Sequence, residues 1–395
     1  MKINKNYLNL ADNYLFAKVT EKAQAYTKQN PDTPLHYMGI GDVTLPLVPA
    51  IIKSMEQSIS EMASKETFRG YGSYQGYDFL REAISAYYTT KNIAINPDEI
   101  FISSGSKGDC TGILELFSTD NLVLIPNPTY PVYLDSNIMD GRKITFINGG
   151  KENNFLPMPD YNIDADIIYI CSPNNPTGAV YDYAGLSNWV NYAIDKNAII
   201  LYDGAYESFI HDNLPSSIFE IEGARECAIE FMSFSKMAGF TGVKCSFVTI
   251  PKELSRDGQN LHSMWLRRLT TRQNTVGYIV QRGAAASLSK EGLIQIKESI
   301  SYYKHNTEII AKTLDKLGIY YTGGKNAPYI WLQCPNNMNS WDFFDYLLHN
   351  AGIVGTPGSG FGTEGEGYFR LSAFGDHETT KIAMDKFERE VKKLC

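Results

Sequence analysis

One lysine in the chain comes soon after an apolar run, a position that can make its side chain reactive. Residues 228–231 are largely apolar and read as a buried strand, and the short segment that follows ends in Lys236. At the carboxyl end of such a strand, a side chain opens into the crevice where α/β proteins bind ligands. An amine that is partly desolvated there has a lowered pKa and can attack a carbonyl carbon. Lys236 is therefore a candidate nucleophile, with a solvated loop lysine as the alternative.

Two other predicted strands end in residues that suit an anion and a flat ring. Ser106 and Lys107 come shortly after the apolar run 100–102 and just before a helical pattern. Backbone N–H groups at the start of a helix, together with the helix dipole, favour a phosphate. A plain strand–helix turn would have the same composition. After the run 122–125, prolines hold Tyr130 at the sheet edge, where an ordinary packed aromatic is the alternative.

Two more strand ends carry amide and acidic side chains. Segment 171–178 includes Asn175, and its two prolines, two asparagines and glycine fix the backbone. Asp203 ends the hydrophobic run 199–202, and Tyr206 follows three residues later. An acid at the end of a buried strand is costly unless a cation or an N–H group faces it.

The order of these groups along the chain fits a pyridoxal phosphate site. This cofactor needs a lysine for its Schiff base and an acid that keeps its pyridine nitrogen protonated. It also needs donors to its phenolic oxygen, an aromatic side chain over its ring and a cradle for its phosphate. Asn-Pro-Thr-Gly, then Asp-x-x-Tyr, then Ser-x-Ser-Lys supply these groups in sequence.

Alternating strands and helices are expected to bring these residues together. Several of the short apolar runs are continuous rather than alternating, which is typical of a mainly parallel sheet covered on both faces. The carboxyl ends of its strands should gather along one edge. The seven runs are residues 100–102, 122–125, 144–147, 167–170, 199–202, 228–231 and 247–250.

The rest of the chain predicts a second, smaller α+β domain. A long helical region runs from Tyr278 to about residue 317, and strand, helix and strand patterns follow at 329–332, 341–348 and 368–372. Residues 1–45 hold no long periodic segment and are expected to form an arm that packs on something else. We therefore expect a large domain at 46–287 and a small domain made of 1–45 and 288–395.

Composition excludes several other classes of protein. The formal charge of −8, from 36 Lys and Arg against 44 Asp and Glu, argues against nucleic acid or an anionic membrane as partner. The six cysteines lack metal-site spacing and read as reduced, and six scattered histidines predict no metal site. The first residues have no apolar core typical of a signal peptide. We expect a cytoplasmic protein.

Six segments together resemble the fold-type I, class I/II aminotransferase family, whose members use pyridoxal phosphate. The resemblance runs nearly end to end, and members that act on LL-2,6-diaminopimelate match best. The segments are Asn-Tyr-Leu-Phe at 13–16, Arg-Gly-Tyr-Gly at 69–72, Ser-Pro-Asn-Asn-Pro-Thr-Gly at 172–178, Ser-Phe-Ser-Lys-Met-Ala-Gly-Phe-Thr-Gly at 233–242, Thr-Pro-Gly-Ser-Gly-Phe-Gly at 356–362 and Phe-Arg-Leu-Ser-Ala-Phe-Gly at 369–375.

The resemblance implies roles in cofactor binding. Lys236 would form the Schiff base and move the substrate proton, and Asp203 would pair with the pyridine nitrogen. Asn175 and Tyr206 would hydrogen-bond the phenolic oxygen, and Tyr130 would stack on the ring. The residues that would hold the phosphate are Ser106, Lys107, Ser233 and Lys244.

It also implies how substrates bind. Arg370 would clamp the substrate α-carboxylate, a task for which its planar fork is suited, with Gly41 and Asn175 beside it. Family members are homodimers with shared active sites, so Tyr14, Tyr71 and Asn274 would reach the partner's cofactor. The implied reaction passes an amino group between LL-2,6-diaminopimelate and 2-oxoglutarate, giving tetrahydrodipicolinate and glutamate in lysine biosynthesis.

Three departures from the family pattern bear on the substrate. Lys244 stands where the family usually has arginine, residues 273–275 read Gln-Asn-Thr where an aromatic-Asn-Gly is usual, and Tyr74 replaces an acid found in some members. The alternatives are therefore an aminotransferase for aromatic or acidic amino acids, a C–S lyase on the same fold, or a non-catalytic regulatory protein.

Overall fold

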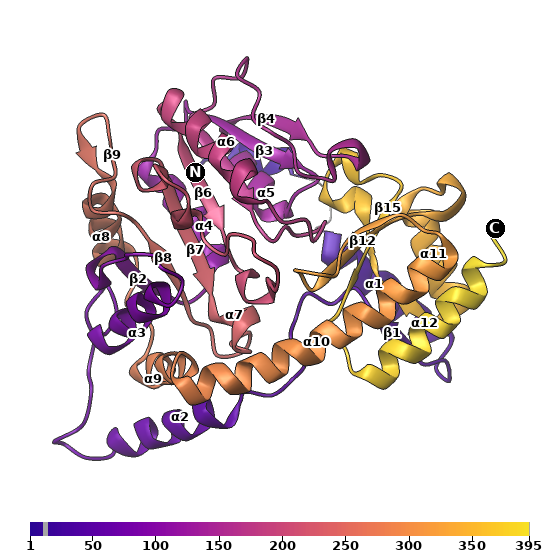
Figure 1. Cartoon of the computed structure of the whole chain (residues 1–395), viewed down its shortest axis with the longest axis horizontal. Helices are drawn as coiled ribbons and strands as arrows, with labels where there is room; N and C mark the ends of the chain where they lie inside the picture. The colour runs from indigo at the N-terminus through magenta and orange to yellow at the C-terminus, as the bar shows by residue number, and fades with distance from the viewer. Residues whose placement is uncertain (11–14, 395) are drawn as a thin grey trace.

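A seven-stranded sheet forms the centre of the larger part of the molecule (Figure 1). The computed structural model describes residues 1–10 and 15–394. The strand order is β2-β8-β7-β6-β5-β3-β4, with β8 antiparallel to both neighbours and the other pairs parallel. The strands are β2 (Ile100–Ser103), β3 (Leu122–Asn127), β4 (Lys143–Asn148), β5 (Ile167–Cys171), β6 (Ile199–Asp203), β7 (Ala228–Ser233) and β8 (Ser246–Thr249).

All seven predicted runs are strands of this sheet, and the mainly parallel α/β fold is confirmed. Every residue of β5 and of β6 is buried, which explains why these runs are apolar without alternation. The register places Cys171 opposite Asp203, and Asp203 opposite Phe231. The polar ends of the parallel strands therefore lie along one edge.

Helices cover both faces of the sheet. One face packs on α3, α6 and α9, through clusters that contain Ile84 and Trp189. The other packs on α4, α5 and α8, through a cluster that contains Tyr133 and Trp265. These helices and α2, which packs beside α9, are α2 (Pro49–Glu61), α3 (Asp78–Thr89), α4 (Ser106–Gly112), α5 (Pro131–Asp140), α6 (Tyr183–Asp195), α8 (Leu261–Arg272) and α9 (Tyr278–Ser287). The four-residue α7 (Phe234–Met237) follows β7 directly.

A second, antiparallel sheet has the order β11-β12-β15-β14 and lies to the right in Figure 1. Its helices share one apolar core with it. Two further sheets have two strands each: β1 pairs in parallel with β13, and β9 pairs antiparallel with β10. The strands are β11 (Tyr321–Gly323), β12 (Tyr329–Gln333), β14 (Thr356–Pro357), β15 (Tyr368–Ser372), β1 (His36–Tyr37), β13 (Ile353–Val354), β9 (Ser255–Arg256) and β10 (Gln259–Asn260), and the helices are α1 (Leu15–Gln29), α10 (Lys290–Leu317), α11 (Ser340–Ala351) and α12 (His377–Val391).

The structure corrects two expectations about helices. Residues 1–45 were expected to hold no long periodic segment, but α1 is a 15-residue helix. It buries only Leu15, Ala23 and Tyr26, so its apolar stripe is too narrow to stand out in the sequence. The long region from Tyr278 is two helices, because Ser289 begins α10 as its N-cap and accepts from the N–H of Gly292.

In the part of the chain that the structure describes, no helix is both long and apolar enough to cross a membrane. The cytoplasmic location and the boundaries of the two domains stay predictions.

Candidate active site

A cavity of about 350 Å³ opens at the carboxyl ends of the parallel strands. The last residues of β5, β6 and β7 lie on its wall, together with the start of α4 and the segment around Gly41. Most of the predicted site residues meet here. Those on the wall are Gly41, Ser106, Lys107, Tyr130, Asn175, Asp203, Tyr206, Ser233, Lys236 and Lys244.

Lys236 lies in α7, immediately beyond β7. Ser233 caps this helix by accepting from the N–H of Ser235 at 3.1 Å, which fixes the direction in which the chain leaves the strand. The Nζ group of Lys236 donates to the carbonyl of Gly41. Burial, with the nearby charges of Arg370 and Lys244, lowers the pKa of Lys236 to about 8, and Asp42 partly opposes this. Roughly a tenth of this amine is therefore uncharged at pH 7, far more than for an exposed lysine.

Asp203, the last residue of β6, is a buried carboxylate. Its Oδ2 accepts from the hydroxyl of Tyr133 at 2.5 Å, and its Oδ1 accepts from the N–H of Ala205 at 3.0 Å. Burial raises the pKa of Asp203, and the two hydrogen bonds oppose that rise. Among the described residues, no lysine, arginine or histidine forms an ion pair with it. A cation bound in the cavity would supply the partner that this carboxylate lacks.

The lining of the cavity includes hydroxyl and ammonium groups from two segments of the chain. Ser106 and Lys107 come from the first turn of α4, and Ser233, Thr241 and Lys244 come from the end of β7 and the loop after α7. Within the described chain, neither lysine pairs with a carboxylate. Two unpaired ammonium groups beside three hydroxyls make a site for a phosphate-like anion.

Arg370 lies one layer behind the wall rather than on it. It is fully buried, its Nη1 donates to Asn175 Oδ1 at 2.6 Å, and its Nη2 donates to the carbonyl of Gly39 at 2.9 Å. Its guanidinium also lies over the ring of Tyr329, 4.3 Å from the centroid. Because no part of Arg370 reaches the surface, a role in a surface salt bridge is excluded. Arg370 can act on a ligand in the cavity beside Asn175.

Besides Arg370, two predicted residues of the described chain do not line this cavity. Tyr71 and Asn274 are exposed, the former with 91% of its surface accessible. Neither is among the residues that line the cavity. Tyr14 lies outside the described residues. All three were predicted to reach the site of a partner subunit, and that prediction stays untested.

The structure also adds residues that the sequence did not reveal. Tyr133 holds Asp203, and Tyr329 lies with its hydroxyl 2.9 Å from that of Tyr206. Asp109 on α4 accepts from Ser103 and Ser246 and so ties this helix to β2 and β8. Tyr133 comes three residues after Tyr130, and this helical spacing was the one signal that could have indicated it.

The cavity combines an amine of lowered pKa, a buried acid and an anion site, and no metal site accompanies it in the described chain. No group of three or more His, Cys, Asp or Glu side chains there is placed to hold a metal ion. The model of the family "Aminotransferase class I and II" matches residues 34–387. The chain belongs to this family.

Known proteins resemble the chain over nearly its whole length. An LL-diaminopimelate aminotransferase of Lawsonia intracellularis is 49% identical over 404 aligned residues, covering 98% of each chain. The structure of the L,L-diaminopimelate aminotransferase from Chlamydomonas reinhardtii matches with a TM-score of 0.93 at 39% identity, again over 98% of each chain. An aromatic aminotransferase from Pyrococcus horikoshii matches with a TM-score of 0.83 at 25% identity, over 94% of this chain and all of the other. The predicted family and fold are confirmed.

Proposed function

We propose that the protein is a pyridoxal phosphate-dependent aminotransferase that passes an amino group between LL-2,6-diaminopimelate and 2-oxoglutarate. Its products would be tetrahydrodipicolinate and glutamate. The observation that carries the chemistry is that the amine of Lys236 and the carboxylate of Asp203 face one cavity. The similarity to two diaminopimelate aminotransferases over 98% of the chain supports the substrate.

The residues on the wall fit the cofactor. Asp203 would meet the protonated ring nitrogen, which supplies the cation that its burial requires. Asn175 accepts from Arg370 through Oδ1, which leaves its Nδ2 donor for the phenolic oxygen of a ligand. The phosphate would bind Ser106, Lys107, Ser233 and Lys244, and Tyr130 would lie against the ring. When bound, pyridoxal phosphate supplies an aldehyde that takes up the amino group and a ring that withdraws electrons.

Lys236 would both attach the cofactor and move a proton. Because burial lowers the pKa of its amine to about 8, the free base is available for attack on an aldehyde near neutral pH. Once displaced by the substrate amino group, the same amine lies at the cavity wall. It would then be placed to move the proton from the substrate Cα to the cofactor carbon C4′.

The substrate carboxylate would bind on the side of Arg370, Asn175 and Gly41. The guanidinium donates to Asn175 and to Gly39, so it is already oriented by groups that do not move with the ligand. A substrate carboxylate beside Asn175 would meet a guanidinium that these contacts already position, and a planar guanidinium can bind a carboxylate through two parallel charged hydrogen bonds. This would hold the reacting Cα in place.

We further propose that residues 46–287 form the cofactor-binding domain and that 1–45 with 288–395 form the smaller one. Pairing of β1 with β13, and packing of Ala23 and Tyr26 into the core around β12 and α11, support the assignment of the N-terminal segment. We also propose a cytoplasmic homodimer in which Tyr71, Asn274 and Tyr14 complete the partner's site.

The assignment is tested by supplying LL-2,6-diaminopimelate with and without 2-oxoglutarate. We expect glutamate to form only when both are present, and the Lys236→Ala variant to form none. Pyruvate or ammonia released without an oxo acid would show a lyase instead. Faster glutamate formation from tyrosine or aspartate would assign the chain to another aminotransferase, and turnover by Lys236→Ala would overturn the proposed role of the lysine.

A further inference from the structure

Segment 39–45 contacts both groups that would act on the substrate. The carbonyl of Gly41 accepts from Lys236, and the carbonyl of Gly39 accepts from Arg370 Nη2 at 2.9 Å. Asp42 lies on the cavity wall beside Gly41. The position of this segment therefore decides how much room a carboxylate has between Lys236 and Arg370.

The segment has no regular secondary structure of its own between β1 and α2. At its start, the N–H groups of Met38 and Gly39 donate to the carbonyl of Val354 at 2.8 and 2.9 Å. Residues 40–47, which lead to α2 at Pro49, belong to no helix or strand. A chain of this kind keeps one position only if other groups bind its backbone.

The carbonyls of Gly39 and Gly41 bind Arg370 and Lys236, and one hydroxyl binds backbone N–H groups of the same segment. Tyr303 is 2% exposed, and its OH accepts from the N–H of Thr44 at 2.9 Å and from that of Leu45 at 2.8 Å. Within the described chain, these are the hydrogen bonds that backbone N–H groups of residues 40–47 donate. The ring of Tyr303 lies edge-on to Phe374, 5.1 Å away, and Lys236 Nζ lies 5.5 Å from the centre of that same ring.

Tyr303 belongs to a helix that touches both parts of the molecule. Figure 1 shows α10 running from beside α2 and α9 to α12. Tyr303 lies in its middle, on the side facing segment 39–45. We infer that Tyr303 is a positioning residue, which holds this segment so that Gly41 and Asp42 border the substrate site next to Lys236 and Arg370.

The inference rests on the proposed function only for the choice of substrate. Tyr303→Phe removes one oxygen and leaves both N–H groups without their acceptor, while the ring still packs. The neighbour Tyr302 offers a matched control, since its OH accepts one N–H, from His377 at 3.1 Å, at the start of α12. Tyr302→Phe therefore removes the same oxygen from the same helix, away from the cavity wall.

We expect Tyr303→Phe to raise the half-saturating concentration of LL-2,6-diaminopimelate and of glutamate by roughly tenfold, as for the loss of one or two hydrogen bonds. Its kcat and its affinity for pyridoxal phosphate should stay within about threefold of wild type. Tyr302→Phe should leave all these values within about twofold, and both variants should have similar melting temperatures. An equal KM in the two variants, or lost cofactor affinity in Tyr303→Phe alone, would overturn the inference.

A second measurement does not depend on a variant that folds. Amide hydrogen exchange of wild-type protein should show protection at Thr44 and Leu45, and exchange at the rate of an open loop there would also overturn the inference. If wild-type protein accepts glutamate but not LL-2,6-diaminopimelate, the proposed substrate fails. The role of Tyr303 is then decided by the glutamate values.

Discussion

Burial shifts the pKa values of Lys236 and Asp203, in each case in the direction that favours the uncharged form. The lowered pKa of Lys236 favours its reaction with an aldehyde, because only the free amine attacks one. For Asp203 the raised pKa reflects the lack of a cation, and a protonated ring nitrogen would reverse the shift. Burial in the same cavity thus makes the Lys236 amine more reactive, and it leaves the Asp203 carboxylate in need of a cationic ligand.

The lowered pKa of Lys236 predicts how cofactor capture depends on pH. Below about pH 8 the fraction of free amine rises about tenfold per unit of pH, and above it the fraction levels off. We expect the rate at which the cofactor-free protein takes up pyridoxal phosphate to follow this curve in stopped-flow absorbance. A rate that keeps rising to pH 10, as for an exposed lysine, would contradict it.

At the scale of elements, the strands of the large sheet could be predicted from the sequence. Helix α1 and the contact between Tyr133 and Asp203 could not. A buried parallel strand must be apolar on both faces, so β5 and β6 appear as continuous runs. Helix α1 exposes most of its surface and gives a weak pattern. Tyr133 could not be assigned to Asp203 from sequence, because the contact depends on how α5 packs against β6.

The strand β7 carries a buried acid, Glu230, that predicts a pH-dependent stability. Burial raises its pKa to about 7, although Tyr88, Ser217 and the N–H of Ile218 donate to it. Between pH 4.5 and 7 the unfolded chain therefore loses this proton while the folded chain keeps it, so stability falls as the pH rises. The change is about 1.4 kcal/mol per unit, or about 3 kcal/mol in all.

Urea unfolding of wild type and Glu230→Gln at several pH values measures this effect. Because every other group is shared, the difference between the two free energies of unfolding isolates Glu230. We expect wild type to lose about 3 kcal/mol relative to the variant from pH 4.5 to 7.5. Parallel stability curves would show that Glu230 ionises normally in the folded protein.

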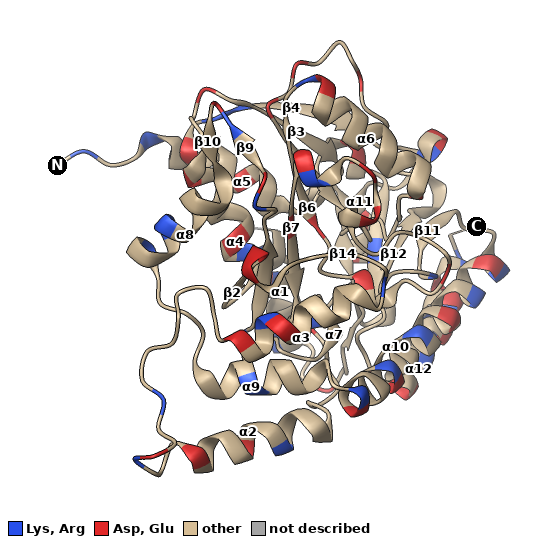
Figure 2. Cartoon of the chain, turned by 60° about the vertical axis from the view of Figure 1, so that its left-hand side comes forward, with Lys and Arg blue, Asp and Glu red and all other residues tan. Residues whose placement is uncertain are grey.

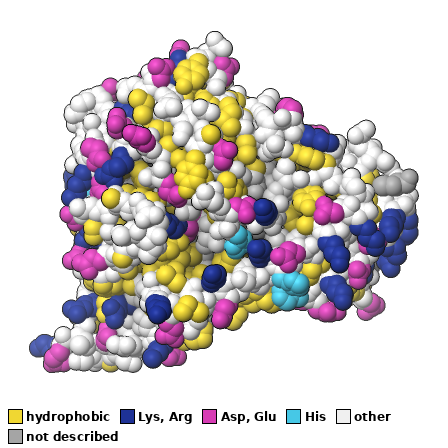
Figure 3. All heavy atoms as spheres, viewed as in Figure 1, with side chains coloured by type: hydrophobic (Ala, Val, Ile, Leu, Met, Phe, Trp, Pro, Cys, Tyr) yellow, Lys and Arg dark blue, Asp and Glu magenta, His cyan; other side chains and the backbone are white. Residues whose placement is uncertain are grey.

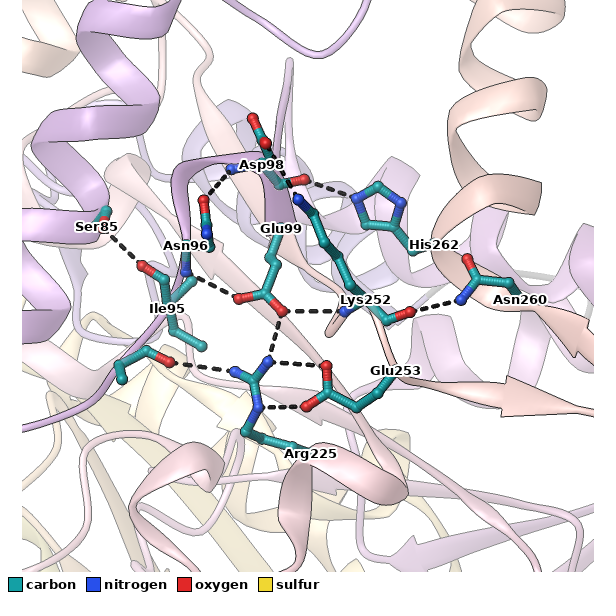
Figure 4. Close-up of polar contacts among 11 residues, drawn as sticks. Ser85, Ile95, Asn96, Asp98, Glu99, Arg225, Lys252, Glu253, Asn260 and His262 are labelled. Carbon is teal, nitrogen blue, oxygen red and sulfur yellow. Dashed lines mark hydrogen bonds and ion pairs between the residues drawn. The ribbon is translucent and has the colours of Figure 1, made fainter.

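An ion network ties the opposite, amino ends of β2 and β7 (Figure 4). The buried Glu99 accepts from Arg225 Nη2 at 2.6 Å and from the N–H groups of Asn96 and Lys252 at 2.8 and 3.0 Å. Arg225 also pairs with both oxygens of Glu253. Arg225 therefore neutralises one nearly inaccessible carboxylate and one exposed one.

Replacing Arg225 should lower the free energy of unfolding and leave catalysis unchanged. We expect Arg225→Met to lower the free energy of unfolding by about 2–3 kcal/mol, because the buried side chain of Glu99 loses its cationic partner. Lys196→Met, which breaks the exposed pair with Asp164, should cost under about 1 kcal/mol. KM should not change in either variant. Equal stabilities would mean that solvent already screens Glu99.

At the scale of the whole molecule, the surface carries charged side chains of both signs and exposed apolar side chains. Acidic and basic residues both occur along α10 and α12 (Figure 2). Apolar side chains gather in the middle of the face in Figure 3. The projecting α2 and the loop after it expose large apolar side chains, which suits a subunit interface. They are Ile52, Ile59, Phe68 and Tyr71.

The proposed sharing of active sites between subunits predicts complementation between defective chains. A mixed dimer of Lys236→Ala and Tyr71→Ala chains would contain one site with both native residues, so random mixing should restore about a quarter of wild-type activity. Mixing Lys236→Ala with Asp203→Asn is the control, because both residues line the cavity of one chain and no native site can form. Recovery in the control, or none with Tyr71→Ala, would contradict shared sites.

The most direct test of the central claim is a single half-reaction. Protein loaded with pyridoxal phosphate is mixed with LL-2,6-diaminopimelate in the absence of any oxo acid, and the absorbance of the bound cofactor is followed. We predict complete conversion at low concentration, with meso-diaminopimelate, tyrosine and aspartate at least about tenfold less effective. Conversion by tyrosine or aspartate but not by LL-2,6-diaminopimelate would contradict the proposed substrate, and failure to bind the cofactor would contradict the site itself.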